Sequence, residues 1–203
     1  MKTVAKGPAP EGVRAYLKST PTATFEDMKH ACSEEMARAF EAEQKGLCAF
    51  CCNKLDAMPE PDRGRIAHVS PRDFGEIPET EWSNLVLSCD SELLSDPSCD
   101  AKQGNKPLPV SPLMPGIEGL FHYYLSGRME GLNENARETI RILNLDSADE
   151  ADRNHRLRTA RRIAIQTAAE IKDKLTAAEW DKTLRGAYRP LPAFQPALAK
   201  LLR

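Results

Sequence analysis

The sequence of 203 residues lacks any run of 18 or more apolar residues, and this absence excludes a membrane-spanning helix. Residues 1–8 lack the apolar core of a secretion signal. Together these absences predict a cytoplasmic protein without a membrane partner. Because the cytoplasm keeps thiols reduced, the six cysteines need an explanation other than disulfide bonds. Internal repeats and low-complexity tracts are also lacking, which disfavours an array of sequence-reading zinc fingers.

The composition is that of an ordinary globular protein, with 41% hydrophobic and 29% charged residues. The net charge of −2 conceals an uneven distribution along the chain. Residues 150–203 carry 12 Lys and Arg against 6 Asp and Glu, whereas residues 1–149 have an excess of acidic residues. A basic region beside an acidic body indicates a surface for a polyanion or an acidic partner, and solvated helix faces are the alternative.

The first segment, residues 1–46, is expected to be an arm followed by a helix. Residues 1–21 contain three prolines and little periodicity, so they predict an extended arm. Thr24 and Asp27 form a capping-box pair that predicts the start of a single helix. An apolar stripe at helical spacing follows, and Gly46 is expected to end the helix.

The rest of the chain divides at about residue 115. Residues 47–115 contain short apolar runs at 64–69 and 85–87 that predict strands. Residues 116–203 are expected to be helical, with helix starts at the pairs Ser147–Glu150 and Thr176–Glu179. The sequence therefore predicts an α+β fold in which a small module lies between two helical regions.

Four of the cysteines form two pairs, Cys48-x2-Cys51 and Cys89-x9-Cys99. The tight first pair has the spacing of a zinc knuckle, and four thiolates would make a closed, structural zinc site. Cys52 competes with its neighbour Cys51 for the second ligand position. The alternative is that all of these are buried free cysteines, a common core residue.

Between and after the cysteine pairs lie His68 at the end of a predicted strand, Asn84 before the next strand, and Asp100 after the last cysteine. This order of residues resembles the HNH endonucleases. The resemblance implies a zinc-stabilised ββα-metal finger. In that family the histidine activates water, the asparagine orients the histidine, and the residue at the start of the helix binds a metal ion.

Flanking segments resemble one branch of the HNH endonucleases. These segments are residues 7–10, 43–51 and 140–145. The branch is the HNH nuclease subunit of Septu-type and retron-associated anti-phage defence systems. The resemblance implies an ATPase partner, and it also allows for a reverse transcriptase and its nucleic-acid product.

Residue by residue, the resemblance implies that His68 is the general base, Asn84 its orienting residue and Asp100 a ligand of catalytic Mg²⁺ or Mn²⁺. Lys102 is a candidate contact to a phosphate. Ala67 departs from the family, which often has an acidic metal ligand there. Either Asp100, a nearby carboxylate such as Asp73 and phosphate oxygens hold the ion, or the site is degenerate.

The predicted function is a metal-dependent nuclease that cleaves phosphodiester bonds, with DNA as the expected substrate and RNA as the alternative. Arg158, Arg161 and Arg162 of the basic region are candidates for contact with the nucleic-acid backbone, and an interface with the ATPase partner is equally consistent with them. The alternative function is a non-catalytic zinc module that binds nucleic acid or docks a partner, and Ala67 is the reason to consider it.

Overall fold

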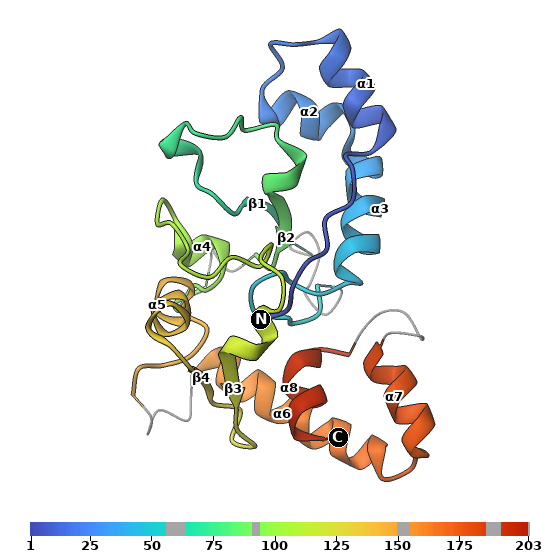
Figure 1. The fold of residues 1–203 in the computed structure, drawn as a ribbon, viewed down its shortest axis with the longest axis vertical. Helices are drawn as coiled ribbons and strands as arrows, with labels where there is room; N and C mark the ends of the chain where they lie inside the picture. The colour runs from blue at the N-terminus through green and yellow to red at the C-terminus, as the bar shows by residue number, and fades with distance from the viewer. Residues whose placement is uncertain (56–63, 91–93, 150–154, 186–191, 203) are drawn as a thin grey trace.

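The structure, a computed structural model, describes residues 1–55, 64–90, 94–149, 155–185 and 192–202. Within these residues the fold is α+β, as predicted, with eight α-helices and two small antiparallel sheets. Helices α1 to α3 lie at one end of the molecule, α6 to α8 lie at the other, and the first sheet lies between them (Figure 1). No helix in the described parts of the chain is long and apolar enough to cross a membrane.

The N-terminal segment is more helical than its sequence predicts. Helix α1, Glu11–Ser19, lies within the expected extended arm, so that expectation was wrong. The physical reason is that Pro10 only precedes the helix, where a missing N–H costs nothing, and buried Val13 anchors the helix. The Thr24–Asp27 capping box is confirmed, but the single helix expected after it is two, α2 at Phe25–Ala31 and α3 at Ser33–Gln44, because the chain turns at Cys32.

Both strands predicted in the middle segment are confirmed. Strand β1, Arg65–His68, pairs antiparallel with β2, Leu85–Ser88, in a register that sets His68 opposite Leu85. Helix α4, Asp100–Gln103, follows after the last cysteine of the pairs. The end of β1 therefore lies beside the start of β2.

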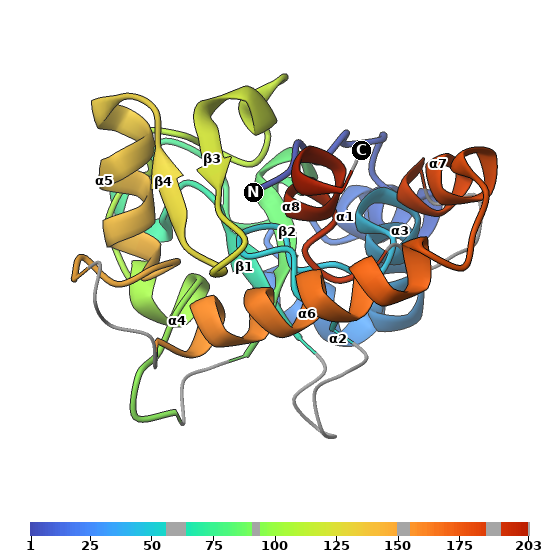
Figure 2. The same cartoon turned by 90° about the horizontal axis from the view of Figure 1, so that it is seen from below.

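The C-terminal segment contains a second hairpin that its sequence did not predict as strands. Strands β3, Phe121–Tyr123, and β4, Met129–Gly131, pair antiparallel. Their side chains alternate between buried and more exposed positions, which is the period of a strand and not of a helix, and the two strands lie side by side in Figure 2. Gly127, in the left-handed region, makes the turn, and its Cα lies so close to the Arg158 carbonyl that a side chain there would clash.

Four helices complete the segment: α5 Glu134–Leu143, α6 Arg156–Lys172, α7 Ala177–Arg185 and α8 Gln195–Leu201. The hydrogen bonds of the Thr176–Glu179 capping pair confirm the predicted start of α7. The Ser147–Glu150 pair does not begin α6, which starts at Arg156, and Glu150 lies outside the described residues.

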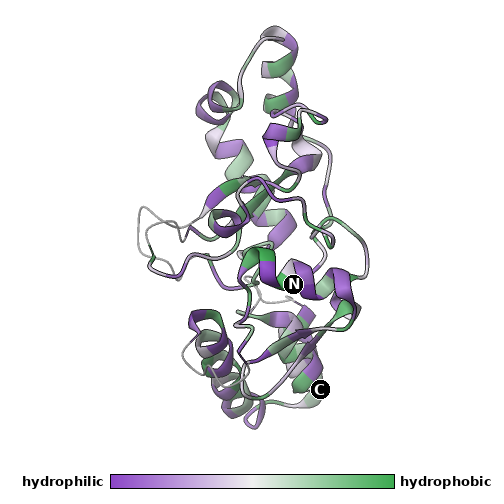
Figure 3. Ribbon diagram, turned by 90° about the vertical axis from the view of Figure 1, so that its left-hand side faces the viewer, coloured by the Kyte–Doolittle hydropathy of each residue, from purple (hydrophilic) through white to green (hydrophobic). Residues whose placement is uncertain are grey.

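All three segments contribute to the principal core cluster. Met1 and Val4 of the first segment pack with the cysteine pairs of the second and with Phe121 and Leu145 of the third. Hydrophilic and hydrophobic residues alternate around the helices, as expected when each helix buries one face (Figure 3). The cysteine pairs therefore lie in the shared interior and not at the surface.

Candidate metal centre and cleft

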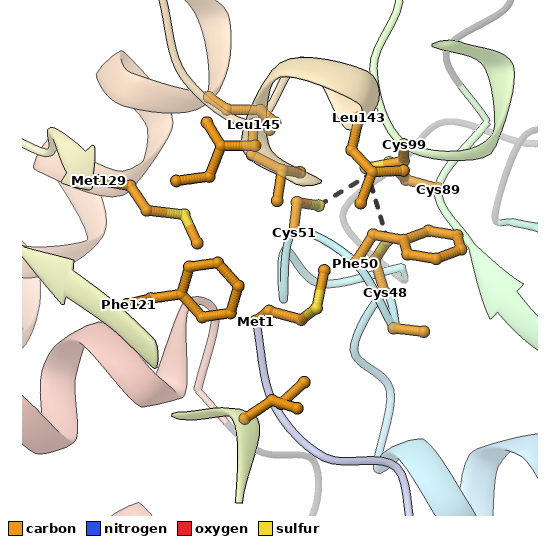
Figure 4. Close-up of a cluster of buried hydrophobic side chains, with 14 of the residues drawn as sticks. Met1, Cys48, Phe50, Cys51, Cys89, Cys99, Phe121, Met129, Leu143 and Leu145 are labelled. Carbon is orange, nitrogen blue, oxygen red and sulfur yellow. Dashed lines mark hydrogen bonds between the residues drawn. The ribbon is translucent and has the colours of Figure 1, made fainter. Parts of the chain in front are cut away.

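The four cysteines of the two pairs lie together in the interior. One sulfur from each lies within 4.8 Å of all the others, and all four residues are buried. The Sγ atoms of Cys48 and Cys99 are 3.8 Å apart, and those of Cys51 and Cys89 are 3.9 Å apart (Figure 4). A tetrahedral zinc ion with Zn–S bonds near 2.3 Å requires sulfurs about 3.8 Å apart. The cluster could therefore hold a metal ion such as zinc.

Short-range backbone hydrogen bonds place the first pair. The Cys48 N–H donates to the Asn53 carbonyl, and a β-bridge between Leu47 and Lys54 closes the loop below it. The Ala49 N–H donates to the Leu87 carbonyl and so docks this loop on β2. The knuckle therefore approaches the end of the strand that leads into Cys89.

The second pair converges although nine residues separate its members. Cys89 directly follows β2, and Cys99 directly precedes α4. The Cys99 N–H donates to the Leu143 carbonyl at the end of α5, at 2.8 Å. A residue of the third segment thus fixes the position of the last cysteine of the group.

The other two cysteines lie outside the group. Cys52 adopts a positive φ of 62°, which turns the chain out of the knuckle, and it packs against Leu47 instead. Burial raises the pKa of the Cys52 thiol to about 11, so it stays protonated at neutral pH. Cys32 belongs to the core cluster of the N-terminal helices. The spacing argument for Cys51 over Cys52 is consistent with this arrangement.

Protonation of the cluster also fits a cation. Burial raises the pKa of the Cys48 thiol, but hydrogen bonds from the three neighbouring thiols outweigh burial and leave that pKa well below its usual value. Hydrogen bonding with Cys48 and Cys89 raises the pKa of Cys51, and burial raises that of Cys99. Without an ion, only part of the cluster can be charged, whereas a bound divalent cation stabilises all four thiolates.

A cavity of about 1220 Å³ lies on the face of the first sheet opposite the cysteine cluster. Residues of β1, α2, α3, α4 and the loop after β1 line it, among them Phe25, Met36, Arg65, His68, Asp73 and Asp100. Two of the three residues of the HNH resemblance, His68 and Asp100, thus line the same cavity. The N-terminal helices supply one of its walls.

His68 is held on two sides. Its Nε2 lies 2.8 Å from the Glu79 carbonyl, and its ring meets the Phe25 ring edge-on with centroids 4.7 Å apart. Because a carbonyl only accepts hydrogen bonds, Nε2 carries the proton of the neutral ring. No described residue hydrogen-bonds Nδ1. Burial lowers the pKa of His68, so the neutral ring, with its lone pair on Nδ1, dominates at neutral pH.

Asn84 is buried and contacts the loop after β1 instead of the imidazole. Its Oδ1 accepts from the Ser70 N–H at 2.8 Å, and its Nδ2 donates to the Ser70 carbonyl at 3.0 Å. The Val69 N–H also donates to the Asn84 carbonyl. Asn84 therefore fixes the backbone that leaves His68, and any orienting effect on the ring is indirect.

Asp100 is paired with a residue that the sequence reasoning missed. Its Oδ2 lies 2.9 Å from Nε of Arg65, the first residue of β1. Asp73 accepts a short hydrogen bond from Asn105, also at the cavity wall. Among the described residues, the cysteine cluster alone gathers three or more metal-ligating side chains, so the cavity contains no such preformed site.

The basic residues proposed for nucleic acid separate into two groups. Lys102 and Arg162 are exposed. Arg158 and Arg161 are buried, and both pair with the buried carboxylate of Asp146, at 2.7 and 3.7 Å. The expectation that these two arginines contact nucleic acid is therefore corrected, because their guanidinium groups are enclosed in the core.

Two residues with contacts at the cavity escaped the sequence reasoning, Arg65 and Glu79. Arg65 starts a predicted strand, where a charged side chain carries no signal of its partner. Glu79 follows Ile77-Pro78 in a loop, and only the folded chain reveals that its carbonyl meets His68. A scan against protein-family models and a search of curated proteins find no match for this chain.

Proposed function

We propose that this protein is a metal-dependent nuclease of the HNH type with a structural zinc ion in its cysteine cluster. The observation that carries the proposal is the position of His68: it ends β1, lines a large cavity together with Asp100, and keeps Nδ1 without a partner among the described residues. The β1–β2–α4 order and the adjacent cysteine cluster support an HNH finger.

In this proposal His68 is the general base. Its Nδ1 lone pair accepts the proton of the attacking water, and the Glu79 carbonyl keeps Nε2–H in place and stabilises the imidazolium that forms. Burial keeps the ring neutral before the reaction. Asn84 holds the loop that follows the ring.

The cavity offers hard oxygen donors for Mg²⁺ or Mn²⁺, chiefly Asp100, with Asp73 nearby on the wall. Such an ion neutralises charge on a phosphate, and Mg²⁺ commonly binds through one or two carboxylates plus phosphate oxygens. Because Asp100 is paired with Arg65, the proposal requires Asp100 to exchange this partner for the ion.

The resemblance to Septu-type and retron-associated nuclease subunits extends the proposal to a defence complex. DNA is the expected substrate, an ATPase the expected partner, and a reverse transcriptase with its product a further one. Lys102 and Arg162 are exposed cations that such partners or a phosphate backbone can reach.

The test is the His68→Ala variant of the full chain, assayed for cleavage of plasmid DNA with Mg²⁺ and, separately, with the ATPase present. Cleavage is expected to disappear while the zinc content stays that of the wild type. His122→Ala is the matched control, because His122 is an exposed histidine on β3, outside the cavity lining. Cleavage retained by His68→Ala would refute the assignment.

The second candidate function is a non-catalytic zinc module that binds nucleic acid or a partner. Two observations favour it: Ala67 contributes no metal ligand, and Asp100 is already ion-paired. This function predicts salt-sensitive DNA binding by the wild type without cleavage at any Mg²⁺ or Mn²⁺ concentration, with or without the ATPase.

A further inference from the structure

Glu79 contacts three different parts of the cavity wall. Its backbone carbonyl accepts from His68 at 2.8 Å. Its side-chain Oε1 accepts from the Phe25 N–H at 3.0 Å, and its Oε2 lies 3.6 Å from a guanidinium nitrogen of Arg72. One residue thus joins β1 to the first residue of α2, which is remote in sequence.

The contact at Phe25 completes the N-terminus of α2. The first N–H groups of a helix have no partner within the helix. The Thr24 hydroxyl accepts from the Asp27 N–H, and the Glu79 carboxylate accepts from the Phe25 N–H. One of these donors is therefore capped locally and another by a residue remote in sequence. The side chain of Phe25, directly after the cap, is the one that meets the His68 ring.

We infer that Glu79 is a positioning residue through which helix α2 sets the orientation of the His68 imidazole. A displacement of α2 moves Phe25, and the Phe25 N–H is hydrogen-bonded to the Glu79 side chain, which moves with it. The backbone of Glu79 carries the carbonyl that holds Nε2 of His68. The inference concerns the geometry of the ring, and its consequence for cleavage rests on the proposed function.

The electrostatic surroundings of the ring belong to the same elements. Glu26 of α2 and Glu79 favour the protonated ring, whereas Arg72 and burial disfavour it. Because the Glu79 carbonyl bonds the ring while the Glu79 side chain pairs with Arg72, a substitution at this position changes several of these influences at once. The position of the ring proton is therefore a cleaner measure than the pKa.

The experiment compares Glu79→Ala with Glu79→Gln in the full chain. Glutamine keeps an oxygen acceptor for the Phe25 N–H, whereas alanine removes it. Glu81→Ala is the matched control, because Glu81 is a nearby carboxylate whose hydrogen-bond donor among the described residues is Ser83. The measurement is ¹⁵N NMR of the histidine side chains, with His68 assigned by the His68→Ala variant.

The neutral His68 ring is expected to carry its proton on Nε2, with slow exchange between tautomers, in the wild type and in the variants Glu79→Gln and Glu81→Ala. In Glu79→Ala, both tautomers are expected with rapid exchange. Cleavage by Glu79→Ala is expected to lose about tenfold in kcat with KM unchanged, and Glu79→Gln is expected to restore it. A single Nε2–H tautomer in folded Glu79→Ala would overturn the inference.

The two proposals fail in different ways. If His68→Ala still cleaves DNA, the proposed function fails, while the NMR result for Glu79→Ala still decides the positioning role. If Glu79→Ala does not fold, Thr24→Ala tests the same connection, since it loosens the N-terminus of α2 and leaves Glu79 in place. An unchanged His68 tautomer and exchange rate in Thr24→Ala would then overturn the inference.

Discussion

At the scale of single residues, Cys51 and Cys52 show how the backbone decides which sulfur can bind a metal ion. The two are neighbours and both are buried, so neither composition nor burial separates them. The positive φ of Cys52 turns its side chain toward Leu47, and the sulfur of Cys51 joins the cluster. Metal affinity should therefore differ sharply between adjacent positions.

This difference gives the first prediction. Cys51→Ser should lose most of the bound zinc, because a hydroxyl is a poor zinc ligand at neutral pH. Cys52→Ser should keep a full equivalent, as measured by elemental analysis of protein purified without added metal. Equal zinc contents in the two variants would contradict the assignment of the ligands.

The second prediction at this scale concerns pH. Burial lowers the pKa of folded His68 below the value of about 6.5 in an unfolded chain. The unfolded state therefore binds a proton more tightly, and stability should fall as pH falls through 6.5 and level off below the folded pKa. In urea titrations from pH 4.5 to 8, His68→Gln should lack this part of the decline. Parallel curves for the two proteins would contradict the pKa shift.

At the scale of elements, the arginines of α6 lie on two faces, one buried and one exposed, and the sequence does not distinguish them. Arg158 and Arg161 are core residues, and Arg161 also donates to the Leu145 carbonyl at 2.9 Å. Both arginines pair with the one buried carboxylate of Asp146. Helix α6 is thereby fixed to the chain segment that also holds Cys99 through Leu143.

Removal of that carboxylate is the third prediction. Asp146→Ala removes the buried carboxylate that pairs with two buried guanidinium groups, and it should lower the free energy of unfolding by about 3–5 kcal/mol. Arg162→Ala, at an exposed position of the same helix, should change it by less than about 0.5 kcal/mol. Urea unfolding followed by circular dichroism measures both. Similar small effects would show that the Asp146 group contributes little.

The elements also separate what a sequence can predict from what it cannot. Strands β1 and β2 and the starts of α2 and α7 follow from local signals: short apolar runs and capping pairs. Helix α1 and the β3–β4 hairpin depend on burial against distant residues, and the inward arginines depend on Asp146, which lies outside their helix.

The candidate site divides in the same way. The cysteine spacing was enough to select the four cysteines that the structure gathers. The HNH resemblance grouped His68 with Asp100, and both line the same cavity. The partners of these residues, Glu79 and Arg65, could not be predicted, because hydrogen bonds to a backbone carbonyl and surface ion pairs leave no pattern in one sequence.

At the scale of the whole molecule, the cysteine cluster lies in the core that the three segments share, whereas the helices at the two ends also have core clusters of their own. The principal core takes residues from all three segments, and the cluster lies within it. A bound ion would link the knuckle, the end of β2 and the start of α4. Its loss should therefore affect the middle of the molecule before the helices at its ends.

The fourth prediction follows. Chelation of zinc should raise hydrogen exchange first in residues 47–105, and then at the end of α5, which the Leu143–Cys99 hydrogen bond connects to the cluster. Helices α1 and α7 should respond last, since their buried residues belong to separate core clusters. Exchange by mass spectrometry with and without a chelator measures this order. Uniform or unchanged exchange would contradict a structural role for the ion.

The contact between Phe194 and the knuckle bears on the order of events during synthesis. The Phe194 N–H donates to the Cys52 carbonyl at 2.7 Å, and the Phe194 ring is buried in the principal core. A ribosome releases residues 48–52 long before residue 194, so the knuckle lacks its contact with Phe194 during most of synthesis. The knuckle is therefore expected to reach its final packing only after residue 194 has been translated.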